Sequence, residues 1–142
     1  MRLRLDKVVR VVALGVKRVY SLVLTDEGLY LIQTGHVGVL KHIRLDDRRQ
    51  LVIDRPDNRA VQDLLANESR VGTAPLDDLA KVEGNYFIRL EAIEDGELRP
   101  NKKQPEMWIG VTGSEHHLFF PFATEEEVQA FQRALSKSIG LR

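Results

Sequence analysis

The clearest pattern along the chain is a pair of apolar runs separated by a short polar turn. The runs are Val19–Thr25 and Leu29–Gln33, and residues 26–28 between them read Asp-Glu-Gly. This arrangement is typical of a β-hairpin. It predicts a three-residue loop in which Gly28 takes the left-handed conformation of a bulge. The alternation predicts one shared face for Tyr20, Leu22 and Leu24, opposite Leu29 and Leu31.

Strands are also predicted on both sides of this hairpin. Val8–Val16 is rich in β-branched residues, which favour a strand, although the spacing of its apolar residues also suits one face of a helix. Two apolar segments between Val37 and Asp54 flank the polar turn 46–49 and predict a second strand pair. Strands are therefore expected over about residues 8–54.

Helical structure is predicted in the middle of the chain. Asp57 is expected to cap a short helix over about residues 57–67. Pro75–Val82 fits either one helical turn or an extended crossing, because its apolar residues lie three apart. The expected apolar face of the first helix consists of Val61, Leu64 and Leu65.

The last third of the chain predicts three more strands, over about residues 85–122. Tyr86–Ile93 alternates as a strand does, and a charged stretch at 94–105 is expected to be a loop. Alternating apolar residues on both sides of a polar turn at 112–115 predict a further hairpin.

A helix is expected at the C-terminal end, over about residues 125–139. Thr124 and Glu127 have the spacing of a capping box, in which each side chain binds the other residue's backbone N–H. The apolar stripe of this helix is Val128, Phe131, Leu135 and Ile139.

The order of elements predicts a single α+β domain over residues 1–142. A chain of this length suits one domain, and 43% hydrophobic with 30% charged residues is ordinary globular composition. Two antiparallel sheets around one core, with the terminal helix over an open end, would bury every predicted apolar face.

Three segments resemble bacterial pleckstrin-homology-like (PH/GRAM-like) domains. Tyr20–Ile32 resembles their second and third strands, Pro75–Val82 their approach to the second sheet, and Met107–Leu135 their last hairpin and closing helix. The resemblance covers residues 8–140, and the helix at 57–67 departs from it as an insertion. It implies a split barrel of two antiparallel sheets with a C-terminal capping helix. It also implies a scaffold that binds proteins, phospholipid head groups or its own copies, without catalytic activity.

Charge and composition narrow the chemistry further. The chain has 21 basic and 21 acidic residues, so it lacks the basic excess typical of nucleic-acid-binding proteins. It has no cysteine, which excludes disulfides, thiolate metal ligands and cysteine nucleophiles, and favours a cytoplasmic location. Charged residues interrupt every apolar stretch, so neither a signal peptide nor a transmembrane segment is expected.

A basic strip near the N-terminus is the first candidate ligand site. It consists of Lys7, Arg10, Lys17 and Arg18, and such a cluster attracts anionic lipids or phosphate ligands. In PH-like domains that bind phosphoinositides, basic residues on the first two strands hold the phosphates. Their pattern places an arginine two positions after a basic residue on the second strand, where this chain has Tyr20. Ordinary solvated strand faces are the alternative interpretation.

Trp108 is the candidate contact for a protein partner. It alternates with Met107 and Ile109, so it lies on the other face of its strand. An exposed tryptophan is a common hot spot of protein interfaces. Burial beneath the 94–105 segment is the alternative, since a lone tryptophan is usually packed.

The histidines do not predict a metal site. His116 and His117 are adjacent on a strand, so their side chains point to opposite faces. His36 and His42 have no evident carboxylate pair beside them. No cofactor is expected either.

The leading expectation is a non-enzymatic cytoplasmic module for protein interaction or self-association into a homo-oligomer. Its interface would be an exposed strand edge, which offers unpaired backbone groups. The alternative is peripheral binding of an anionic lipid or phosphate ligand through the basic strip. An enzyme would require a pocket that holds two titratable groups, and no short catalytic motif indicates one.

Overall fold

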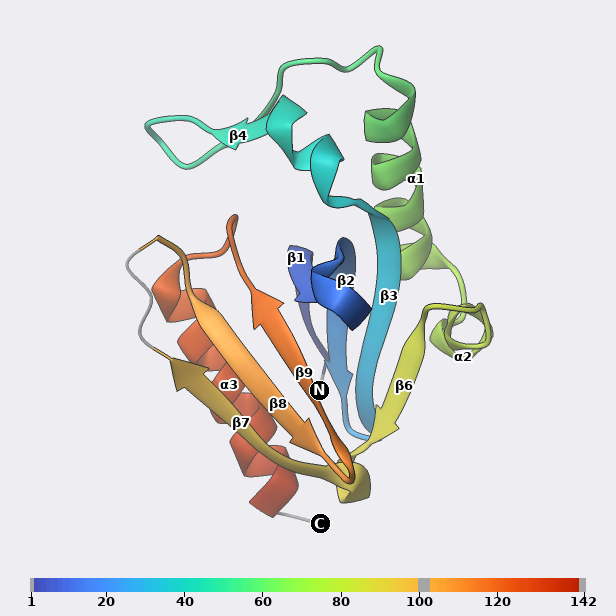
Figure 1. Ribbon diagram of the computed structural model, residues 1–142, viewed down its shortest axis with the longest axis vertical. Coiled ribbons are helices and arrows are strands. Elements are labelled where there is room, and N and C mark those ends of the chain that lie inside the picture. The colour runs from blue at the N-terminus through green and yellow to red at the C-terminus, as the bar shows by residue number, and fades with distance from the viewer. Residues whose placement is uncertain (1, 100–102, 141–142) are drawn as a thin grey trace.

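The computed structural model describes residues 2–99 and 103–140, and they form an α+β fold around one large antiparallel sheet. The order of its strands is β6-β3-β2-β1-β9-β8-β7 (Figure 1). The strands are β1 (Arg2–Val11), β2 (Lys17–Thr25), β3 (Gly28–His36), β6 (Tyr86–Arg89), β7 (Ile93–Arg99), β8 (Glu106–Val111) and β9 (Ser114–Phe119).

The remaining elements lie outside this sheet. Two short strands form a separate pair, and helices pack on both faces of the large sheet (Figure 1). The pair is β4 (Ile43–Leu45) with β5 (Leu51–Ile53), and the α-helices are α1 (Arg59–Thr73), α2 (Leu76–Ala80) and α3 (Glu125–Gly140). The 3-10 helices are η1 (Ala13–Gly15), η2 (Val37–His42) and η3 (Leu90–Ala92). Within the described residues, no helix is both long and apolar enough to cross a bilayer.

The α+β class and the C-terminal helix are confirmed, but the expected division into two large sheets is not. The C-terminal end of β1 pairs with β2 on one side and β9 on the other, which joins both strand groups into one sheet. The sheet does not close, because β6 and β7 are its two edge strands.

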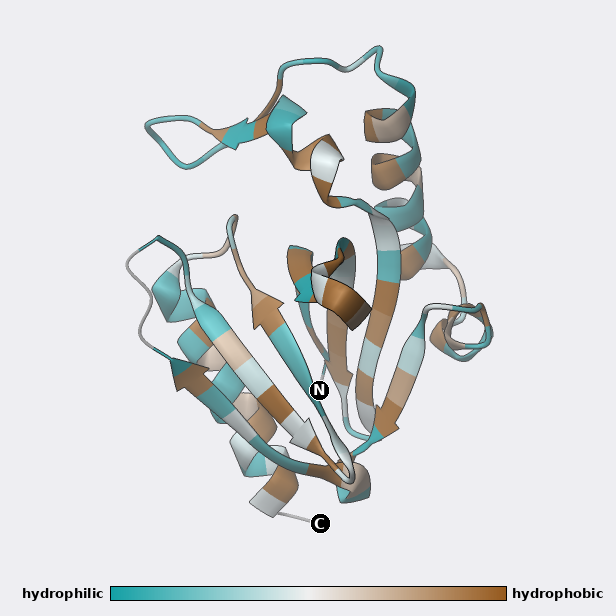
Figure 2. Cartoon of the chain, viewed as in Figure 1, coloured by the Kyte–Doolittle hydropathy of each residue, from teal (hydrophilic) through white to brown (hydrophobic). Residues whose placement is uncertain are grey.

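The main core lies on the concave side of the sheet, beneath α3. Figure 2 shows apolar positions along the strands and along the sheet-facing side of α3. The capping box forms as predicted: Thr124 N–H donates to Glu127 Oε1 at 3.1 Å, and Glu127 N–H donates to Thr124 Oγ1 at 3.0 Å. The core includes Tyr20, Leu22, Leu24, Leu29 and Leu31 from the hairpin and Val128, Phe131 and Leu135 from α3.

The opposite side of the sheet is covered by the segment that follows β3. The predicted hairpin at 37–54 exists only as β4 and β5, because Val37–His42 turns into a 3-10 helix. The predicted helix at 57–67 begins and ends later, as α1, and its cap is Asn58, whose Oδ1 accepts from the N–H groups of Ala60 and Val61. Asp57 as the cap was therefore wrong.

A buried ion pair fixes α1 to the sheet. Lys7 Nζ lies 2.9 Å from Glu68 Oε1, and the two side chains are 7% and 10% exposed. Lys7 sits where the β1–β2 register shifts, with a backbone φ of 55° that turns its side chain toward α1. Arg4 adds a hydrogen bond to the Glu68 carbonyl at 2.6 Å.

The first half of the charged segment 94–105 is a strand, which corrects the expected loop there. Residues 93–99 form β7, an edge strand whose Glu94, Asp95 and Glu97 are exposed. Gly96 faces inward, where an added Cβ would lie 2.8 Å from Leu135 of α3. Charged side chains on an exposed edge strand prevent that edge from pairing with a strand of another molecule. Residues 100–102 lie outside the described residues.

Gly28 has a different role from the one predicted. Its φ is not positive, so no left-handed bulge forms there, and the turn is closed by Thr25 Oγ1, which accepts from the N–H groups of Glu27 and Gly28. The glycine is required by β6, since an added Cβ would lie 2.2 Å from the Ile88 carbonyl oxygen.

Replacing Gly28 with alanine is expected to lower the free energy of unfolding by roughly 1–3 kcal/mol, because β6 must move away from β3. Gly38→Ala is the matched control, since an added Cβ there has no atom within 4 Å. Urea unfolding curves of both variants test this. Equal midpoints for the two would show that β6 accommodates the methyl group.

Candidate functional site

Three basic side chains form a row across the ends of three neighbouring strands. Arg10 of β1 lies directly opposite Arg18 of β2, and Arg18 lies directly opposite His36 of β3. Arg18 Nη1 and His36 Nδ1 are 3.1 Å apart. Like charges directly opposite each other destabilise a sheet unless an anion lies between them.

Arg10 lies against a set of aromatic side chains at this end of the sheet. Its Nε donates to His116 Nδ1 at 3.0 Å and its Nη1 donates to the Tyr20 hydroxyl at 3.3 Å. The guanidinium carbon is 4.6 Å from the centre of the Tyr86 ring. The Tyr20 hydroxyl in turn donates to the Gly84 carbonyl at 2.8 Å. These contacts hold Arg10 in place while offering it no counter-charge.

The surroundings of Arg10 shift the pKa values of two neighbours. Burial, with a further contribution from the Arg10 charge, lowers the pKa of His116 to about 4, so this histidine is neutral at pH 7. Burial raises the pKa of Tyr20, opposed by the charge and hydrogen bond of Arg10. Arg10 is therefore the charged member of a neutral cluster.

The positive charge of this region is not compensated. Within the described part of the chain, no carboxylate lies within 4 Å of a nitrogen of Arg10, Lys17 or Arg18. Arg44, by contrast, has such a partner in Asp54, at 3.1 Å.

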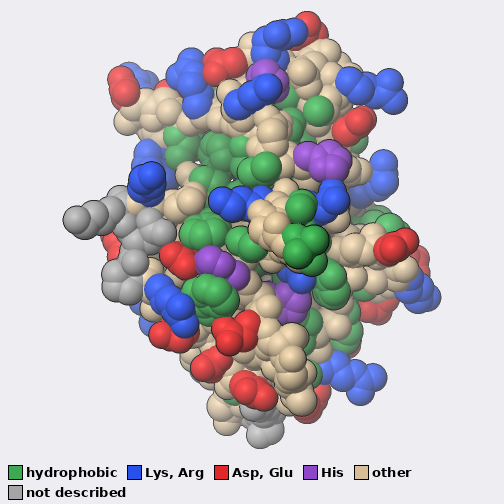
Figure 3. Space-filling model, viewed as in Figure 1, with side chains coloured by type: hydrophobic (Ala, Val, Ile, Leu, Met, Phe, Trp, Pro, Cys, Tyr) green, Lys and Arg blue, Asp and Glu red, His purple; other side chains and the backbone are tan. Residues whose placement is uncertain are grey.

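The loop that joins the two basic strands carries exposed apolar side chains. Leu14 in η1 is 102% exposed and Val16 is 47% exposed, and Val37, next to His36, is 39% exposed. Leu14 also has a positive φ of 59°. The turn containing η1 lies in front of the sheet in Figure 1, and Figure 3 shows hydrophobic, basic and histidine side chains side by side in the middle of the same face. This region of residues 10–18 and 36–37 is called the basic end below.

The four residues of the predicted basic strip are thus divided. Arg10 and Arg18 lie together in the row, whereas Lys17 alternates with Arg18 and is exposed on the other face of the sheet, 5.6 Å from the centre of the Phe119 ring. Lys7 does not join them, because it is buried against Glu68 on the other face of the sheet.

Trp108 lies on the outer face of β8, as its alternation with Met107 predicts. It is half-buried, between the stacked His117 ring at 3.8 Å and the Arg99 guanidinium at 4.6 Å. Its Nε1 donates to Glu106 at 3.2 Å. Both faces of the indole are covered by neighbours, so it presents mainly an edge to solvent.

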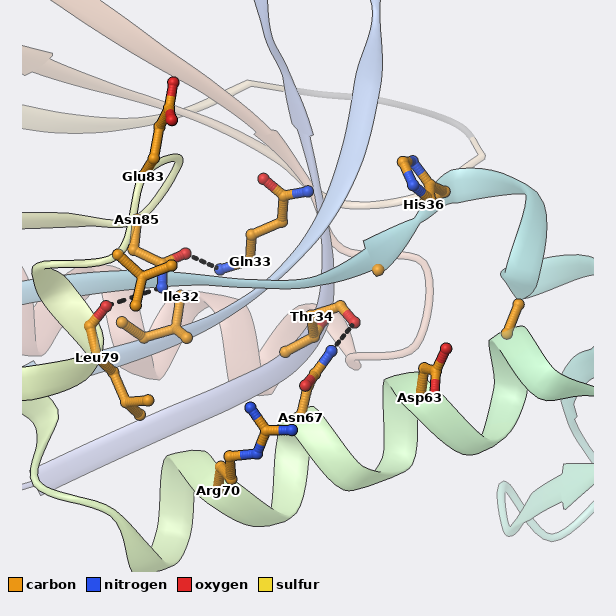
Figure 4. A pocket seen from close by; sticks show the side chains of 13 residues that line it. Ile32, Gln33, Thr34, His36, Asp63, Asn67, Arg70, Leu79, Glu83 and Asn85 are labelled. Atoms are coloured by element: carbon orange, nitrogen blue, oxygen red, sulfur yellow. Dashed lines mark hydrogen bonds between the residues drawn. The ribbon is translucent and has the colours of Figure 1, made fainter.

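A groove of about 430 Å³ runs between β3 and α1 (Figure 4). The edge of β3 from Ile32 to His36 forms one wall. Ala60, Asp63, Asn67 and Arg70 of α1 form the other, and the segment before β6 closes one end with Leu79, Val82, Glu83 and Asn85. The groove meets the basic end at His36.

The described residues contain no group of three or more metal-ligating side chains. His116 points into the cluster around Arg10 and His117 stacks on Trp108, so the two point to opposite faces as predicted. No protein-family model matches the chain, and no curated protein matches it either.

Parts of the site escaped the sequence analysis. No local pattern places His36 beside Arg18, because this position depends on a register shift of β3 between Val19 and Tyr20 of its partner strand. Leu14 lies within Val8–Val16, whose pattern favours a strand and also suits a helix face, but does not indicate a loop. Gly15 follows Leu14 and precedes the basic pair Lys17 and Arg18. This glycine could have indicated an exposed loop.

Proposed function

We propose that this chain is a non-enzymatic binding module of PH-like fold that docks on anionic, phosphate-bearing surfaces through its basic end. The observation that carries the proposal is the row of Arg10, Arg18 and His36, which lies without a carboxylate partner among the described residues, next to the exposed Leu14. An anion above this row relieves the repulsion between the two guanidinium groups.

The apolar loop favours a membrane over a free anion. A lipid surface offers phosphate groups at its boundary and an apolar layer beneath them, which matches cations beside an exposed leucine and valine. Each cation near an anionic leaflet contributes about 1 kcal/mol, and burial of a leucine side chain contributes roughly 1.5–3 kcal/mol. The anionic cytoplasmic leaflet is the surface of this kind in a cell.

The order of strands supports the PH-like part of the proposal. Three antiparallel strands are followed by β6 on the edge of β3, then by the β7–β8–β9 group and a closing helix. The segment 37–82, with α1 and α2, is an insertion in this scheme and covers the outer face of β3.

Lys17→Ala combined with Arg18→Ala is expected to weaken binding to anionic vesicles by roughly 30-fold, at about 1 kcal/mol per charge. Leu14→Asp is expected to weaken it by at least tenfold, by removing the inserted side chain. Co-sedimentation with phosphatidylserine-containing and neutral vesicles, at low and physiological salt, measures both. Arg44→Ala plus Arg55→Ala, on the distant β4–β5 side, removes the same charge and should leave binding unchanged.

A free phosphate ligand predicts a different outcome of the same experiment. Titration with inorganic pyrophosphate would then shift the amide NMR signals of Arg18 and His36 without any binding to vesicles. If neither vesicles nor pyrophosphate bind, or if the control variant weakens binding as much as the loop variants do, the assignment of the basic end is wrong.

Protein interaction is a second candidate function, and the edge of β3 favours it. β6 pairs with β3 only from Gly28 to Leu31, so the rest of this edge has no strand neighbour among the described residues. Self-association through the edge predicts a mass above that of the monomer in light scattering.

A further inference from the structure

The edge of β3 beyond Leu31 has the backbone arrangement of an incomplete sheet. β3 extends to His36, but its partner β6 begins only at Tyr86, opposite Leu31. Before that residue the chain turns away at Gly84, which has a φ of 90°. Ile32–His36 therefore borders the groove instead of a neighbouring strand, over roughly 14–17 Å of extended chain.

Two asparagine side chains occupy hydrogen-bonding positions along this edge. Asn85 Oδ1 accepts from the Gln33 N–H at 2.7 Å, and Asn67 Nδ2 donates to the Thr34 carbonyl at 2.9 Å. Figure 4 shows both bonds, one from each side of the groove. A carboxamide offers the same acceptor and donor as a peptide group, so these side chains take the place of an adjacent backbone.

The wall opposite β3 carries separated charges. Ala60 is small, and Asp63 and Arg70 are seven residues apart on the same face of α1, which is roughly 10 Å along the helix. Arg70 has no carboxylate within 4 Å in the described part of the chain. Asp63 has only the exposed Arg59, at 3.6 Å, among the residues that the structure describes.

We propose that the groove between β3 and α1 binds an extended segment of a partner protein, which adds as a strand to the edge of β3. The added strand displaces Asn85 from the Gln33 N–H and Asn67 from the Thr34 carbonyl and bonds these groups with its own backbone. Side-chain pockets supply specificity. The charges on α1 select a segment with an acidic side chain at Arg70 and a basic one at Asp63. Because side chains of a strand alternate between its two faces, these two residues must lie two or four positions apart in the extended chain. A groove of about 430 Å³ lies within the range of roughly 300–1,000 Å³ that ligand sites occupy.

A displayed library of random twelve-residue peptides tests this proposal, because the selection itself reports the sequence that the groove prefers. Peptides selected on the wild-type protein should combine β-branched residues with an acidic and a basic position at the expected spacing. Ala60→Arg fills the groove from an exposed helix position and should weaken their binding at least tenfold. Ala66→Arg places the same side chain on an exposed position of α1 outside the groove and should not.

Charge reversal and NMR make the test specific for the site. Arg70→Glu should weaken the selected peptides at least tenfold, and exchange of their acidic residue for lysine should restore binding. Amide signals of residues 32–36 should shift, and their hydrogen exchange should slow, when peptide is added.

Three results would overturn the proposal. They are the absence of any enriched peptide, enriched peptides that bind the Ala60→Arg and wild-type proteins equally, and amide shifts confined to regions outside the groove. A dimer that Ala60→Arg dissociates would assign the groove to a second copy of the chain instead of a partner segment.

Discussion

Replacing Glu68 with alanine is expected to lower the free energy of unfolding by about 3–5 kcal/mol, because Lys7 would stay buried without a counter-charge. Lys7 Nζ contacts both carboxylate oxygens of Glu68, at 2.9 and 3.2 Å. Burial raises the pKa of Glu68, and Lys7 opposes that shift by its hydrogen bond and its charge. Since a typical domain is stable by only about 5–15 kcal/mol, α1 should separate from the sheet readily in this variant.

Two further variants separate the ion pair from simple loss of side-chain volume. Lys7→Met with Glu68→Leu removes both charges and should recover most of the lost stability. Asp63→Ala breaks the exposed pair with Arg59 and should cost less than about 0.5 kcal/mol. Guanidinium unfolding curves give the comparison, and a cost for Glu68→Ala no larger than that for Asp63→Ala would contradict the role of the pair.

The ion pair also shows where sequence reasoning reaches its limit. Lys7 was grouped with Arg10, Lys17 and Arg18 because all are basic and close in the sequence. Its actual partner is 61 residues away, on a helix of the inserted segment. Lys7 and Arg10 are three positions apart, so strand alternation already places them on opposite faces, and no local pattern indicates the partner of Lys7 on α1.

Elements whose evidence is local were predicted well. The alternation of Leu22 and Leu24 against Leu29 and Leu31 is confirmed by the register, which pairs Leu24 with Leu29 and Leu22 with Leu31. The capping box at Thr124 is confirmed by its two reciprocal hydrogen bonds. In both cases the residues whose pattern predicts the element are the same residues that make its contacts.

Elements decided by distant contacts were predicted less well. The charges of β7 indicated a loop, whereas pairing with β8 and the packing of Gly96 against Leu135 make it a strand. Gly28 was attributed to its own turn, whereas its lack of a side chain serves β6, about 60 residues later. Arg10 and Arg18 were both predicted as site residues. That they lie directly opposite each other depends on the register between β1 and β2, which the sequence pattern does not determine.

Acidification is expected to destabilise the protein through His116, by up to about 3 kcal/mol between pH 7 and pH 4. The pKa of this histidine is lowered from 6.5 to about 4 by burial and by Arg10. Between these two values the unfolded chain binds a proton at His116 that the folded protein does not bind. The free energy of unfolding therefore rises with pH in this window, and the contribution is complete above the unfolded value of 6.5.

The geometry explains why protonation is unfavourable. His116 Nδ1 accepts a hydrogen bond from Arg10, so a proton on that nitrogen would remove the acceptor and place a second cation against the guanidinium. Tyr86 covers the ring edge at 5.7 Å and supplies no carboxylate.

His116→Gln keeps an acceptor but does not titrate, so its unfolding free energy should vary less with pH than that of the wild type. A ring-proton NMR titration of the wild type should show a midpoint near 4. An equal pH dependence in both proteins would show that protonation of other groups drives acid unfolding. It would also contradict the role of neutral His116 as the hydrogen-bond acceptor of Arg10.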